Sequence, residues 1–197
     1  MSHKPILKEE SHVQSTAVRI LAVGLVLSLP SAFALAAGAK SDSKVPSADE
    51  QFLKDAAAGG MMEVELGKIA ADKAVNDQVK AFGRQMQQDH GKANDELKTL
   101  AANKGVQIPT ALTAKHKRTV DRLSKLSNAE FDRQYMRTMI DDHKEDLKAF
   151  QREADKGKDP DVKQFANKYV PMIQNHLEMA QATGKQLKVA SVSKETR

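Results

Sequence analysis

Residues 79–97, VKAFGRQMQQDHGKANDEL, contain the spacing that decides the fold. Apolar and small side chains recur there at every third or fourth position, which places them on one face of an α-helix. That face consists of Val79, Phe82, Met86, His90, Ala93 and Leu97. The segment therefore predicts an amphipathic helix with a buried face, and this face includes one imidazole.

Three further segments, approximately 48–73, 128–156 and 160–187, show the same periodicity. In the segment 48–73 the residues expected to point inward are Phe52, Ala56, Gly59, Glu63, Gly67 and Ala70. In 128–156 they are Met136, Met139, His143, Leu147 and Phe150. In 160–187 they are Val162, Phe165, Tyr169, Ile173, His176 and Ala180. Four long amphipathic helices predict an all-α four-helix bundle. The composition agrees, because 4% aromatic residues and no tryptophan offer little from which to build a sheet.

The order of the helices favours a ferritin-like bundle made of two helical hairpins. VKAF at 79–82 recurs as VKQF at 162–165, near the start of the second helix of each predicted hairpin. The hairpins are joined by a long connection, 105–127, in which the apolar spacing predicts a short amphipathic helix. Two hairpins joined by one long crossover is a ferritin-like connectivity, whereas a simple up-and-down bundle has three short loops.

The N-terminal segment has the features of a secretory signal peptide. Basic residues precede an apolar stretch, 20–29, and small residues follow it. Cleavage is expected after Ala34 or after Ala39, and an uncleaved N-terminal anchor is the alternative. The predicted organisation is a signal peptide (1–34), a polar linker (35–46), the four-helix-bundle domain (47–187) and a flexible tail (188–197). The mature chain is then periplasmic or secreted, and none of its segments is apolar enough to cross a membrane.

Composition argues against several other functions. The chain has no cysteine, which rules out disulfides, zinc–thiolate sites and a thiol nucleophile. Its net charge of +5 comes from interspersed acidic and basic residues, and no basic run is interleaved with aromatic residues, so nucleic acid is not an expected partner. There is neither a phosphate-binding glycine loop nor a serine–histidine–acid pattern. His116, beside Lys115, Lys117 and Arg118 in the crossover, is expected to have a surface role.

Each predicted helix contributes to its inward face one side chain that can bind a metal: Glu63, His90, His143 and His176. At a rise of about 1.5 Å per residue, ferritin-like connectivity brings all four to a similar level of the bundle. Burying three imidazoles and a carboxylate is costly unless they bind one another or a metal ion. We therefore predict a metal site, and the alternatives are a metal-free polar network or a misassigned helix face.

Neighbouring residues bear on the identity of the metal. A methionine precedes each inward histidine by four positions, about one helical turn. These candidate soft ligands are Met86, Met139 and Met172. Thioether with imidazole suits copper, whereas imidazole with carboxylate suits iron, zinc or manganese. Methionine is also a common filler of helical cores. Three flanking carboxylates either orient the imidazoles or remain solvated: Asp89, Asp142 and Asp146.

Several motifs follow one another in this chain: GMMEVELG (60–67), MQQDH (86–90), FDRQY (131–135), His143 and PMIQNHLEMA (171–180). With them, the region from residue 52 to 182 resembles DUF4142, a family of exported bacterial proteins of unknown function in the ferritin-like class. The resemblance implies the bundle fold and export. It also implies that the positions matching the family's polar motif residues are Glu63, His90, His143 and His176. Members are often labelled outer-membrane proteins, which leaves an association with the outer membrane open.

The expected function is metal binding without an assigned reaction. Ferritin-like di-iron proteins use Glu-x-x-His on two helices, whereas Gln87, Ile140 and Ile173 stand three residues before the histidines here. This departure argues against di-iron chemistry. We predict an exported protein that binds copper, iron or zinc. Two alternatives stay open, a metal-dependent enzyme and a structural or stress-related cell-envelope protein that binds no metal.

Overall fold

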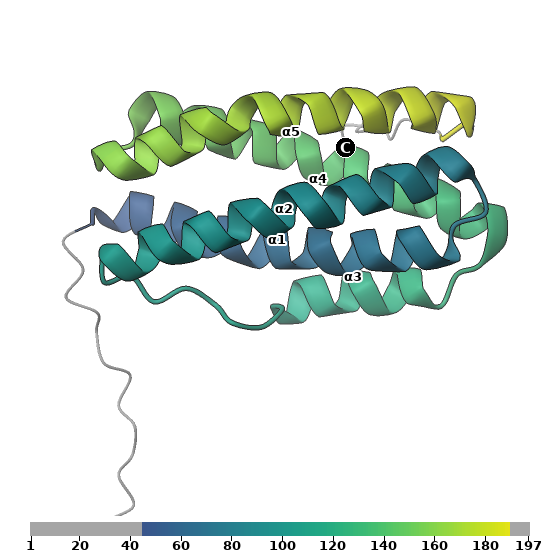
Figure 1. Cartoon of the computed structure of the whole chain (residues 1–197), viewed down its shortest axis with the longest axis horizontal. Helices are drawn as coiled ribbons and strands as arrows, with labels where there is room; N and C mark the ends of the chain where they lie inside the picture. Colours follow the sequence, from purple (N-terminus) through teal and green to yellow (C-terminus); the bar gives the residue numbers. More distant parts are fainter. Residues whose placement is uncertain (1–44, 190–197) are drawn as a thin grey trace, which may run out of the picture. The chain divides into compact units, whose positions relative to one another are not determined.

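The computed structural model describes residues 45–189, and α-helices account for most of them (Figure 1). In chain order the helices of this range are α1 (Ser47–Lys73), α2 (Asp77–Asn103), α3 (Ala114–Ser124), α4 (Asn128–Lys156) and α5 (Pro160–Gln186). The four long helices and the short helix of the crossover are therefore confirmed. The predicted signal peptide (1–34), the linker up to residue 44 and the tail from residue 190 lie outside the described residues.

The second helix of each hairpin begins in the same way. Asn76 Oδ1 accepts hydrogen bonds from the backbone N–H groups of residues 78 and 79, at 2.9 and 3.2 Å. Asp159 Oδ1 accepts from the N–H groups of residues 161 and 162, at 3.0 and 3.1 Å. These N–H groups have no acceptor within their own helix, so the side chains stabilise the start of α2 and of α5. Pro160 occupies the first position of α5, where a missing N–H costs nothing.

The helices form two hairpins, because α1 packs against α2 and α4 packs against α5. The crossover between them carries α3, which runs along α1 (Figure 1) and also contacts α4. The predicted all-α bundle of two hairpins with a crossover helix is confirmed. Among residues 45–189 there is no helix that combines the length and the hydropathy of a membrane span.

Two buried aspartates connect each hairpin to the turn of the other. Asp132 on α4 accepts hydrogen bonds from the N–H groups of residues 75 and 76 in the α1–α2 turn, at 3.2 and 2.8 Å. Asp49 on α1 accepts from the N–H groups of residues 158 and 159 in the α4–α5 turn, at 2.8 and 2.6 Å. The two aspartates have the same separation in sequence as the VKAF and VKQF segments. This reciprocal pair of contacts supports the interpretation of the bundle as a duplicated hairpin.

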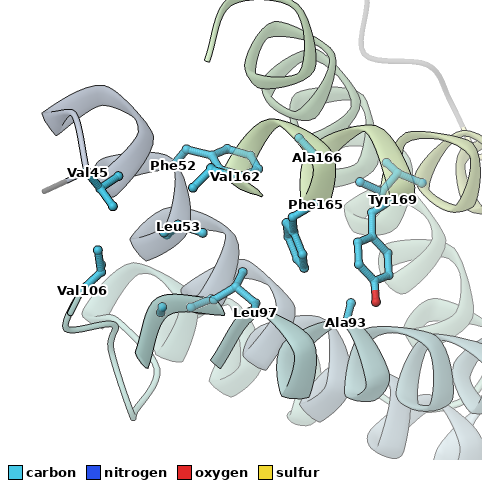
Figure 2. Packing of buried hydrophobic residues seen from close by; sticks show 13 residues of the cluster. Val45, Phe52, Leu53, Ala93, Leu97, Val106, Val162, Phe165, Ala166 and Tyr169 are labelled. Carbon is cyan, nitrogen blue, oxygen red and sulfur yellow. The ribbon is translucent and has the colours of Figure 1, made fainter. Parts of the chain in front are cut away.

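Hydrophobic side chains form two clusters, one toward each end of the bundle. The first cluster lies where α1 and α5 begin, and Figure 2 shows among its members Phe52, Leu53, Leu97, Phe165 and Tyr169. The second cluster lies where α2 and α4 begin and includes Leu66, Phe82, Met86, Tyr135 and Met139. Along each long helix, one buried polar residue lies where the first cluster gives way to the second: Glu63, His90, His143 and His176.

Candidate metal centre

Glu63 on α1, His90 on α2, His143 on α4 and His176 on α5 form a central polar group between the two hydrophobic clusters. Their exposed fractions are 1%, 5%, 0% and 0%, so all four side chains are buried. The imidazole centroids lie 5.5 Å apart for His90 and His143, 5.2 Å for His90 and His176, and 5.5 Å for His143 and His176. Four helices thus bring three rings and one carboxyl group into a single place.

One nitrogen of each imidazole has a polar partner. His143 Nδ1 donates a hydrogen bond to the carbonyl oxygen of Met139 at 3.0 Å, within its own helix. His176 Nε2 donates to Asp89 Oδ2 on α2 at 2.9 Å, and His90 Nδ1 lies 2.7 Å from Glu63 Oε2. Histidines that bind a metal usually donate their other ring N–H to a carboxylate or a backbone carbonyl in this way, which fixes the ring orientation and the tautomer.

The remaining polar atoms of the group have no such partner. His90 Nε2, His143 Nε2, His176 Nδ1 and Glu63 Oε1 are all buried and make no hydrogen bond. One ring nitrogen from each histidine lies within 4.8 Å of those from the other two. Buried polar atoms in proteins almost always have a partner, so four orphaned atoms in one place need an explanation. A metal ion bound by these lone pairs would satisfy them together, and the donor set therefore fits a metal.

A second set of potential ligand atoms overlaps the first. Glu63, Asp142 and His143 each offer one atom within 4.8 Å of the other two. Glu63 Oε1 lies 3.5 Å from His143 Nε2, and Asp142 Oδ2 is buried without a hydrogen-bond partner. The sequence indicated only that Asp142 flanks the site. The structure brings its carboxyl group among the atoms that could themselves bind a cation.

The other predicted site residues lie around this centre. Met86 and Met139 are fully buried in the second hydrophobic cluster, while Met172 and Asp146 line a small interior cavity that Glu63 and His90 also line. His116 is half-buried on α3 and lines a different cavity. It is absent from both sets of potential ligand atoms found among the described residues.

Burial controls protonation in the central polar group. It lowers the pKa of His90 and of His176 to about 4 and that of His143 to about 3, so all three imidazoles are neutral near pH 7. Burial also raises the pKa of Glu63 to about 8, and burial together with the Glu63 charge raises the pKa of Asp142. Neutral imidazoles keep their lone pairs available, and a cation at this centre would compete with protons only for the carboxyl groups.

Tyr135 is a neighbour of the centre that sequence analysis did not single out. Its hydroxyl group is buried without a hydrogen-bond partner, and burial and the nearby Glu63 raise its pKa. Its ring packs edge-on against Phe82, whose centroid lies 6.4 Å from those of both His143 and His176. The spacing of two helical turns between Tyr135 and His143 was the signal that could have placed both on one face.

Comparisons with known proteins agree with the fold. No curated protein is significantly similar to the chain in sequence. Among solved structures, a DUF305 fragment from Deinococcus radiodurans is similar with a TM-score of 0.64 and 15% identity, covering 72% of this chain and 98% of that one. A DUF305 protein of Streptomyces coelicolor, described as a predicted secreted protein, has a TM-score of 0.64 and 11% identity, covering 76% of this chain and 98% of that one. At this level of identity the likeness concerns the fold alone. The family model of DUF4142, a domain of unknown function, matches residues 34–183, and the chain therefore belongs to the DUF4142 family.

Proposed function

We propose that this protein binds a metal ion between its four long helices through His90, His143, His176 and Glu63. The observation that carries the proposal is the set of four buried atoms without hydrogen-bond partners, three nitrogens and one oxygen. Their other polar atoms are held by Met139, Asp89 or one another, so the rings are already oriented. A site that is oriented before binding loses little side-chain entropy when the ligand arrives.

The donor atoms favour copper, iron or zinc over magnesium or calcium. Three imidazoles with one carboxylate suit ions of intermediate softness, whereas magnesium and calcium take oxygen ligands. Met86 and Met139 belong to a hydrophobic cluster, which supports a packing role for them. Met172 lines the interior cavity beside the centre and remains the candidate soft ligand with the best support. Asp89, which contacts His176, is proposed to orient that ring.

The protein is proposed to act after export. Residues 1–34 are the proposed signal peptide, followed by the linker 35–46, the bundle domain 47–187 and the tail 188–197. The fold is shared with a Streptomyces protein described as a predicted secreted protein, which supports this location. Intact mass of the protein recovered from the periplasm of a bacterial host tests the proposal, because cleavage after Ala34 and after Ala39 gives different masses. Recovery of the uncleaved chain would contradict it.

A metal-free structural role in the cell envelope is the second candidate. The contacts of Glu63 with His90 and of Asp89 with His176 favour it, because they partly satisfy the polar group without an ion. This role predicts a chain that folds and functions with no stoichiometric metal. It therefore differs from the first proposal in the metal content of the purified protein.

Elemental analysis of the purified full chain separates the two roles. We expect about one metal ion per chain, and we expect the His90→Ala and His143→Ala variants to fall to background. His116→Ala is the matched control, because it removes an imidazole outside the centre and should keep its metal. Circular dichroism checks that each variant is folded. A wild-type chain that stays metal-free after incubation with copper, iron and zinc would refute metal binding. Turnover of peroxide or oxygen by the loaded protein would add an enzymatic role.

A further inference from the structure

A cavity of about 400 Å³ lies between the start of α1 and the end of α4. Four acidic side chains line it: Asp49, Asp55, Asp146 and Glu153. Arg152 and Lys156 are the basic residues of its lining, so carboxyl groups outnumber positive charges there. Burial raises the pKa of Asp146 and of Glu153, so at these two groups a cation would displace a proton. A carboxylate at the exposed rim attracts cations electrostatically and raises their local concentration.

Glu153 makes this cavity more than an acidic surface. Its side chain is only 7% exposed, and its Oε1 atom is buried without a hydrogen-bond partner. The carboxyl group lies against Gly157, where any Cβ atom would collide with it. Gly157 and Glu153 both line the cavity. The wall of the cavity therefore contains one buried carboxyl oxygen without a hydrogen-bond partner, and a buried polar atom of this kind favours a cationic ligand.

The cavity adjoins the interior space beside the metal centre. A second cavity, of about 20 Å³, is lined by Glu63 and His90 of the central polar group. Ala56, Asp146 and Phe150 line both cavities. Asp146 thus faces the outer cavity on one side and the centre on the other. An ion at Asp146 would stay in contact with oxygen ligands while it loses water, which avoids the large cost of an unpaired charge in an apolar interior.

Another opening reaches the same face of the bundle. A cavity of about 220 Å³ under α3 is lined by His116, Lys115 and Arg122, among others, and it shares Asp142 with the second set of potential ligand atoms. It has no lining residue in common with the interior cavity. Three acidic and two basic residues line it, so its excess of carboxyl groups is smaller than that of the cavity between α1 and α4. Because it also does not adjoin the interior cavity, the cavity between α1 and α4 is the better route.

We propose that metal ions reach the central polar group through the cavity between α1 and α4, and that Asp146 binds the ion where this cavity meets the interior. The inference rests on the proposed metal-binding function. In this proposal Asp146 binds each ion on its way to the central polar group. The acidic side chains at the outer end of the cavity, its mouth, attract cations to it. Asp55 is the best probe of the mouth, because it is exposed and its substitution leaves the core untouched.

The test follows the loading of metal-free full chain with Co²⁺ by stopped-flow absorbance. We expect Asp55→Lys to slow loading about tenfold at low salt, with unchanged final stoichiometry, and the difference should shrink at high salt. Asp95→Lys is the matched control, because it makes the same charge change at an exposed position on α2 and should load within about twofold of wild type. Ala149→Phe, which fills the cavity without changing charge, should also slow loading. Asp146→Asn should slow loading most.

Two results would overturn the inference while leaving metal binding intact. One is equal slowing by Asp55→Lys and Asp95→Lys, which would mean that only net charge matters. The other is slow loading of His116→Ala with normal loading of Asp55→Lys, which would assign the route to the cavity under α3. A wild-type chain that binds no Co²⁺ and no other metal would refute the proposed function itself, and the route with it. Thermal unfolding checks that each variant is folded.

Discussion

Replacing Glu63 by glutamine is expected to stabilise the metal-free protein and, at the same time, to weaken metal binding. Burial raises the pKa of Glu63 from 4.5 to about 8. Between these two pH values the folded chain holds a proton that the unfolded chain has lost, so the free energy of unfolding falls as the pH rises through this window. Glutamine carries no titrating proton, and its amide can keep the contact with His90.

The size of the effect follows from the pKa shift. At 1.36 kcal/mol per pKa unit, the wild-type carboxyl group costs about 1 kcal/mol of stability at about pH 5.5 and about 4 kcal/mol at about pH 7.5. Glu63→Gln should therefore exceed wild type by amounts that grow with pH in this way. The shift arises from burial of the side chain, which is 1% exposed, so salt should screen the effect little.

Urea unfolding of chelator-treated protein, followed by circular dichroism at the two pH values, measures this difference. Glu65→Gln is the matched control, because Glu65 lies two residues away with its side chain partly exposed, and a change within about 0.5 kcal/mol is expected. Metal titration of the same samples should show weaker binding only for Glu63→Gln. A Glu63→Gln variant that is less stable than wild type at both pH values, or a gap independent of pH, would refute the reasoning.

Three further outcomes are expected. Asp89→Asn should weaken metal binding about 10- to 100-fold without loss of stoichiometry, because the ring of His176 loses its carboxylate partner. A chelator competition assay measures the affinity, and an unchanged affinity would contradict this expectation. Metal binding at about pH 7 should release about one proton or more, since the carboxyl group of Glu63 is then mostly protonated. Calorimetry in buffers of different ionisation enthalpy counts the released protons, and no release would contradict the raised pKa of Glu63. Asp132→Ala should lower the free energy of unfolding by about 1–3 kcal/mol, because it leaves the N–H groups of residues 75 and 76 without an acceptor; urea unfolding checks this, and a stability equal to wild type would contradict it.

The helix periodicity predicted most of the buried face of each helix, although four residues expected to point inward are only partly buried: Ala56, Gly59, Leu147 and Phe150. Glu63 and Glu65 differ by two positions, about 200° around a helix, and this difference separates a side chain that is 1% exposed from one that is partly exposed. The rise per residue, together with the two-hairpin connectivity, was likewise sufficient to predict a common level for the three histidines. Both quantities are properties of a regular helix, so they need no knowledge of neighbouring side chains.

Other features of the candidate site depend on rotamers and on packing between helices. Which nitrogen of His176 is free follows from the position of Asp89 on another helix. The place of Asp142 beside Glu63 and His143 depends on the rotation of α4 against α1. The cavities depend on gaps between side chains of different helices. Sequence spacing within one helix contains none of this information.

The aspartate contacts between the hairpins have a consequence for how such a chain can be assembled. Asp49 and Asp132 each bind the turn of the opposite hairpin, so an isolated hairpin would leave its own turn N–H groups and its own aspartate without partners. Two identical hairpins related by two-fold symmetry would form both contacts simultaneously. The hydrogen bonds between the two hairpins are thus those expected of a symmetric dimer whose subunits have been joined into one chain. Since neither contact involves residues 105–127, a nick in that connection should leave two fragments that reassociate.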